Sequence, residues 1–146
     1  MEISLVRNQL RNAIDRARER AQHRRQRVQE AERAYEGFLQ NVATPLAKQI
    51  ANALKAEGYA FTVFTPGGGL RLAADRGRDD YVELGLDTSG DRPQVVARIS
   101  RTRGSRTLEE ERAIKVDASP DQITEGDMLE FWVEVLEPWF ERGSSG

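Results

Sequence analysis

The sequence predicts an α+β fold: a long N-terminal coiled-coil helix, a short helix, an antiparallel meander of four or five strands, and a C-terminal amphipathic helix packed on the sheet. Three observations predict it. Apolar residues recur at helical spacing over the first forty residues and again over residues 124–140, whereas residues 59–116 alternate apolar and polar side chains between turn-forming segments. Because the strands follow one another through short connections, we expect antiparallel pairing of neighbours.

These patterns divide the chain into three segments. Residues 1–43 form the long coiled-coil helix, residues 44–142 form a compact α+β domain, and residues 143–146 resemble the remnant of an expression linker or tag. About a hundred residues are enough to enclose one hydrophobic core. We therefore expect one small domain with a helical extension.

The first helix carries a regular apolar seam. Steps of four and three residues from Ile3 to Val42 meet apolar side chains at ten of twelve positions, a spacing typical of a left-handed coiled coil. A helix this long must cover its seam, so we expect pairing with a second copy; a fold-back onto the C-terminal helix is the alternative. The positions expected to carry the association are Ile3, Leu10, Ile14, Val28, Tyr35, Phe38 and Val42.

The dipeptide Thr44-Pro45 is expected to interrupt this helix, because proline lacks a backbone donor and disfavours helical geometry in the preceding residue. Thr44 can cap a new helix, with Pro45 at its first position and Gly58 beyond its end.

Five β-strands are expected next, at residues 59–65, 70–74, 81–88, 94–101 and 107–116. The glycine run at residues 67–69 follows Pro66 and precedes a strand rather than a helix, so it indicates a hairpin tip and not a phosphate-binding loop. The third and fourth strands should point alternate residues inward, namely Val82, Leu84 and Leu86, and Val95, Ala97 and Ile99.

The last helix should begin at Thr124, with Asp127 completing a capping box. Pro138 should end or kink it, leaving Trp139 and Phe140 to anchor the chain. Because this helix is apolar around most of its circumference, we expect it to be buried on more than one side, against the sheet and against the second helix or another subunit.

Charge is distributed unevenly. Residues 1–33 hold nine arginines and five acids, a net charge of +4, and the remainder holds 13 basic and 19 acidic residues, a net charge of −6. This asymmetry indicates an anionic partner for the helix or pairing between the two halves, although an arginine-rich genome would also give such a bias.

Catalytic chemistry has few residues to use. The chain has no cysteine and one histidine, His23, so thiolate and histidine-rich metal sites and the common nucleophile systems are excluded. Carboxylates in the turns, such as Asp80 and Asp87, leave a metal-dependent enzyme as a third hypothesis, but turns favour these residues for conformational reasons. We expect no catalytic residue, cofactor or metal site.

One segment could contact anions. Four arginines fall within nine residues, at Arg98, Arg101, Arg103 and Arg106. They could contact phosphates, or they could pair with the neighbouring acids at residues 109–111.

The leading functional hypothesis is a non-enzymatic, dimeric interaction or adaptor protein that presents a small α+β domain on a coiled-coil rod. The alternative is a nucleic-acid-binding protein that uses the basic helix and the arginine-rich hairpin. We expect a cytoplasmic location, no membrane contact, and a homodimer formed through the N-terminal helix that could also bind a protein partner.

Overall fold

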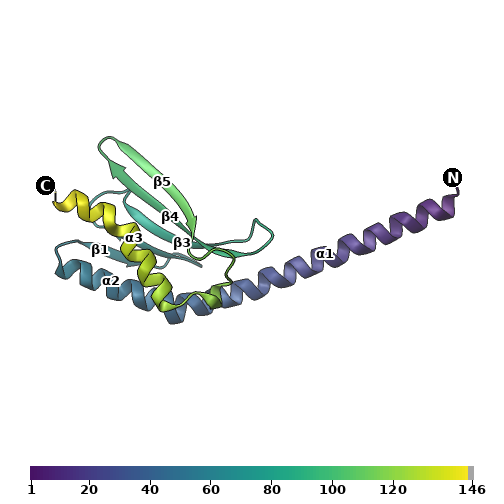
Figure 1. The fold of residues 1–146 in the computed structure, drawn as a ribbon, viewed down its shortest axis with the longest axis horizontal. Coiled ribbons are helices and arrows are strands. Elements are labelled where there is room, and N and C mark those ends of the chain that lie inside the picture. The colour runs from purple at the N-terminus through teal and green to yellow at the C-terminus, as the bar shows by residue number, and fades with distance from the viewer. Residues whose placement is uncertain (145–146) are drawn as a thin grey trace.

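The computed structural model describes residues 1–144 and shows an α+β fold (Figure 1). A long N-terminal helical segment precedes a five-stranded antiparallel sheet and a C-terminal helix. In chain order the elements are α1 (Ile3–Phe38), a π-helical turn (Leu39–Ala43), α2 (Thr44–Ala56), β1 (Phe61–Phe64), β2 (Leu70–Ala74), β3 (Tyr81–Asp87), β4 (Gln94–Arg103), β5 (Arg106–Ala113), a short 3-10 helix (Pro120–Gln122) and α3 (Glu125–Ser144).

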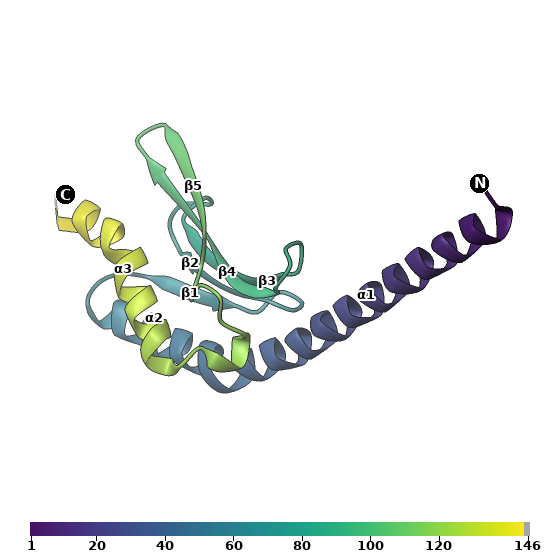
Figure 2. The same cartoon turned by 45° about the vertical axis from the view of Figure 1, so that its right-hand side comes forward.

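Helix α1 extends far beyond the domain. Its N-terminal half stands away from every other element in both views, whereas its C-terminal part joins the domain (Figures 1 and 2). Residues 1–27 are all exposed, Val28 is half-buried, and Ala31, Tyr35 and Phe38 are buried. The helix is continuous from Ile3 to Phe38, so it does not fold back onto α3 as the alternative required.

The expected interruption at Thr44-Pro45 was wrong. The backbone stays helical through a π turn, in which the Thr44 N–H donates to the Leu39 carbonyl five residues earlier. In a regular α-helix the ring of Pro45 would clash with the carbonyl four residues before it. The wider π turn directly before the proline accommodates the ring, and Thr44 makes no side-chain cap.

The sheet is a simple meander in the order β1-β2-β3-β4-β5, with every neighbouring pair antiparallel. The glycine run forms the expected β1–β2 tip, where the Gly69 N–H donates to the Pro66 carbonyl at 2.8 Å. Strand β4 runs two residues further than predicted, to Arg103, and β5 ends earlier, at Ala113. The β4–β5 hairpin therefore projects past the rest of the sheet (Figure 2).

Helix α3 begins with the predicted capping box: the Asp127 N–H donates to Thr124 Oγ1 at 3.1 Å, and the Thr124 N–H donates to Asp127 Oδ2 at 3.0 Å. The predicted end near Pro138 was wrong, because α3 continues through Pro138 to Ser144. The buried Trp139 and the edge-to-face contact of Phe140 with Tyr59 hold the last turns against the domain and offset the lost backbone bond. Of the predicted linker remnant, residues 143–144 belong to α3 and residues 145–146 lie outside the described residues.

The core lies between one face of the sheet and the helices. The inward residues predicted for β3 and β4 are buried there, except Leu86, which is half-buried. They meet Tyr35 and Phe38 of α1, Leu46 and Leu54 of α2, and the buried face of α3. None of the helices in the described residues combines the length and apolarity that a bilayer crossing requires.

Candidate functional site

The free part of α1 is the most exposed apolar surface of the protein. We call residues 3–27 the arm. Ile3, Leu10 and Ile14 are 78%, 59% and 48% exposed, and Val6 is also exposed. At 100° per residue these four side chains fall on one side of the helix, in line with Ala13, Ala17 and Ala21, and they border a shallow groove of about 570 Å³. We call this line the arm stripe.

Arginines border the arm stripe on both sides. Helical geometry sets Arg7, Arg11 and Arg18 along one edge and Arg20 and Arg27 along the other. The arm holds eight arginines and two acids, a net charge of +6. Within the described part of the chain no residue of α1 takes part in an ion pair, since all four ion pairs lie in the domain. The arm therefore offers an apolar surface with unneutralised positive edges.

The seam predicted from the sequence divides at Val28. Tyr35 and Phe38 are buried in the core of their own domain, and Val42 is half-buried against it, so these three side chains contact their own chain. The remaining predicted positions, Ile3, Leu10 and Ile14, stay exposed on the arm. Val6, which the four-three spacing skipped in favour of Arg7, also belongs to the arm stripe; a moment calculated at 100° per residue would have included it.

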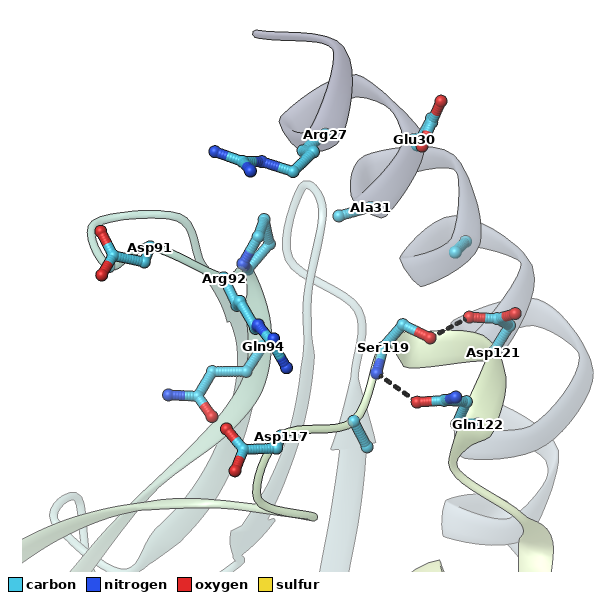
Figure 3. Close-up of a pocket in the computed structure, with 14 residues that line it drawn as sticks. Arg27, Glu30, Ala31, Asp91, Arg92, Gln94, Asp117, Ser119, Asp121 and Gln122 are labelled. Carbon is cyan, nitrogen blue, oxygen red and sulfur yellow. Dashed lines mark hydrogen bonds between the residues drawn. The ribbon is translucent and has the colours of Figure 1, made fainter. Parts of the chain in front are cut away.

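A cavity of about 910 Å³ marks the base of the arm (Figure 3). Arg27 reaches across it from α1, and Arg92, Gln94 and Asp117 face it from the β3–β4 loop and the segment after β5. Its other wall is structural, because Ser119 Oγ donates to Asp121 Oδ1 at 2.5 Å and the Ser119 N–H donates to Gln122 Oε1 at 2.9 Å. Charges of both signs line the cavity without converging on one point, so it does not resemble a small-molecule site.

A second cavity, of about 960 Å³, lies between the π turn and the β1–β2 tip and borders Tyr35. Burial, and secondarily the negative charge of Glu83, raises the pKa of the Tyr35 phenol to about 12. The hydroxyl is fully enclosed and has no hydrogen-bond partner among the described residues. Because the cavity does not expose this hydroxyl, it offers no ready catalytic acid or base.

The four hairpin arginines do not form one cluster. Arg98 lies between Glu83 and Glu111 in the strand register, on the outer face of the sheet. Arg101, Arg103 and Arg106 share the opposite face near the hairpin tip, since Arg103 is paired with Arg106. The acids at residues 109–111 are exposed, and only Glu111 pairs in register with an arginine.

The turn carboxylates hold the fold together. Asp75 accepts from Thr62 Oγ1 at 2.6 Å, and Asp87 accepts from the Ser89 hydroxyl and N–H, which lowers the pKa of Asp87. Asp80 is buried and accepts from the Thr102 N–H. The described residues contain no group of three or more His, Cys, Asp or Glu side chains arranged to hold a metal ion, and His23 is exposed on the arm.

A second exposed apolar surface lies on α3. Leu129 and Val133 are 49% and 61% exposed, one helical turn apart, although the apolar composition of α3 predicted burial on more than one side. Glu130 and Glu137 are exposed on the same side of the helix. Sequence inspection could not separate these two apolar residues from the buried Met128 and Trp132 beside them.

The chain has no significant match among protein-family models, curated proteins or solved structures, so its function is argued from its own residues.

Proposed function

We propose that the protein is a non-enzymatic interaction protein that self-associates through its arm and presents the α+β domain at the end of that rod. One observation carries the proposal: four large apolar side chains of the arm lie exposed on one side of a helix that no other part of the described chain covers. A surface helix normally buries such a stripe against a partner.

Energetics favour a reciprocal contact. Full burial of one large aliphatic side chain contributes about 1.5–3 kcal/mol, so Ile3, Val6, Leu10 and Ile14 together contribute about 6–12 kcal/mol. Association costs roughly 4–15 kcal/mol in lost rigid-body freedom and side-chain ordering. One arm contact is therefore marginal. A two-fold dimer makes the contact twice while losing rigid-body freedom once, so we expect a dimer that dissociates on dilution.

The role of adaptor follows from the shape. The arm spans about 37 Å at 1.5 Å per residue and holds its attachment surface away from the domain. The sheet face opposite the core and the β4–β5 hairpin remain open to other partners. The two cavities described above bring together no converging polar groups, which supports an interaction role over catalysis.

The test is the solution mass of the full chain, measured by analytical ultracentrifugation over a range of concentrations. We expect a dimer for the parent protein and a monomer for a double variant, Leu10→Asp with Ile14→Asp. Both residues are exposed, so the domain keeps its fold, which circular dichroism verifies.

The matched control is Leu5→Asp with Asn12→Asp. It also introduces two acids into the arm, but on the side away from the arm stripe. The control should remain dimeric. A parent chain that stays monomeric at all concentrations contradicts the proposal, as does a control that dissociates as fully as the stripe variant.

A second candidate function is nucleic-acid binding, favoured by the arm charge of +6 and by the shared face of Arg101, Arg103 and Arg106. Binding through phosphates releases counterions and weakens steeply with added salt. Retention on DNA or RNA at low ionic strength that is lost with salt supports it. No retention at low ionic strength removes it.

A further inference from the structure

We propose that the arm of one copy docks on the exposed face of α3 in a second copy, rather than on the arm of that copy. The proposal rests on the self-association argued above and names its acceptor surface. We define the α3 face as Gly126, Leu129, Glu130, Val133 and Glu137, all exposed. The argument uses the exposed apolar side chains, the charges and the reach of the helix.

The first step is apolar complementarity. Beyond Met1, which precedes α1, every large apolar side chain exposed on a described helix lies either on the arm or on α3. The arm contributes Ile3, Leu5, Val6, Leu10 and Ile14, and α3 contributes Leu129 and Val133. Each surface is a helix side that lacks a cover, and a helix laid along another helix would cover both.

The second step is charge complementarity. Residues 125–137 of α3 hold five acids and no basic residue, whereas the arm has a net charge of +6. Glu130 and Glu137 flank the exposed leucine and valine, just as arginines flank the arm stripe. An arm on the α3 face therefore sets arginines beside glutamates at the edge of an apolar contact, where opposite charges select a partner.

The third step excludes a paired arm. In a parallel coiled coil the flanking positions would set Arg20 of one arm near Arg25 of the other, with Arg24 within the contact itself. In an antiparallel pair the edge that carries Arg11, Arg18 and Arg25 would face its own copy. Either arrangement concentrates positive charge with no acid on the flanks of residues 3–27, so like charges oppose it.

The fourth step excludes the α3 of the same chain. Helix α1 is unbroken from Ile3 to Phe38, and the buried Tyr35 and Phe38 fix its C-terminal part in the core. The arm consequently points away from α3 in both views (Figures 1 and 2). Only an α3 from another copy can meet it.

The chain has no cysteine, which makes disulfide trapping specific. Two full-length single-cysteine variants, Ile14→Cys and Val133→Cys, are mixed and oxidised, and the cross-linked peptides are identified by mass spectrometry. We expect a mixed disulfide between residues 14 and 133 of different chains to form at least about tenfold faster than with Asn12→Cys, whose side chain lies on the opposite side of the arm.

The outcomes separate this inference from the proposed function. Cross-links between two copies of Ile14→Cys, without the mixed product, overturn the α3 acceptor but leave self-association intact. Absence of all cross-links together with a monomeric parent chain overturns both.

A charge reversal gives an independent readout. Arg11→Glu with Arg18→Glu should weaken dimerisation about tenfold at low ionic strength, and Glu130→Arg with Glu137→Arg in the same chain should restore it. If the arms paired with each other, the arginine reversal would not weaken the dimer in this way and the α3 reversal would not restore it, which would contradict the inference.

Discussion

The indole Nε1 of Trp139 donates a hydrogen bond of 3.2 Å to Oδ1 of Asp80, joining α3 to the β2–β3 turn across 59 residues of sequence. The same oxygen accepts from the Thr102 N–H at 2.9 Å, at the point where β4 leaves the sheet. A single buried carboxylate thus ties together the turn, the base of the β4–β5 hairpin and the last turns of α3. Buried charged acceptors of this kind are costly to remove.

Asp80→Ala should lower the free energy of unfolding by about 3 kcal/mol, because it removes two hydrogen bonds to a charged group. Trp139→Phe should cost about 1–2 kcal/mol, since the ring keeps much of its packing but loses its donor. A double-mutant cycle in urea should give a coupling energy of about 1 kcal/mol. Strictly additive losses would argue against the bond.

Gly77→Ala should destabilise the fold by about 2 kcal/mol or more. Gly77 has a φ of 102°, and an added Cβ would lie 2.5 Å from Oδ2 of Asp80. Gly90→Ala is the matched control, since an added Cβ there meets no atom within 4 Å and the backbone conformation is ordinary. Thermal melts of both variants check this, and equal melting temperatures would contradict it.

The phenol of Tyr35 should ionise only near pH 12, because burial and the charge of Glu83 disfavour the phenolate. The raised pKa favours the protonated folded state, so its contribution to stability is complete below the ordinary value of 10.0 and is lost as the pH rises toward 12. Phenolate absorbance, followed against pH with and without Tyr35→Phe, should show a late step only in the parent chain. Ionisation of this residue below pH 10 would count against its burial.

The capping box of α3 should make stability depend on acid pH. The Thr124 N–H, and then Lys115, lowers the pKa of Asp127 below its ordinary value of 3.8. This contribution is present above pH 3.8 and is lost as the pH falls through the lowered pKa. Asp127→Asn should therefore lose less stability than the parent between pH 5 and pH 2, as measured by thermal melts. Parallel pH profiles would contradict the assignment.

Much of the fold was predictable because it depends on local periodicity. Helices and strands repeat every 3.6 and 2 residues, so apolar spacing alone located both helical regions and all five strands, and it identified Val82, Leu84, Val95, Ala97 and Ile99 as inward residues. The capping box at Thr124 is equally local. Turn composition identified the hairpin tips for the same reason.

Packing overrode the local signals at both prolines. A proline inside a helix costs about 3 kcal/mol, which predicted an end near Pro45 and near Pro138. Buried neighbours on either side, Ala43 and Leu46 at the first and Trp139 at the second, hold the backbone helical. The size of that compensation depends on contacts with distant segments, which no local pattern contains.

The sequence by itself determined that an apolar seam runs from Ile3 to Val42 and that arginines accompany it. Only the tertiary structure decided where that seam divides, because Leu10 and Tyr35 are equivalent in the repeat, yet one is exposed and the other is buried in the core. It also left Leu129 and Val133 uncovered on α3. Burial depends on which surfaces the completed fold brings together, and periodicity reports only which side of a helix can be buried.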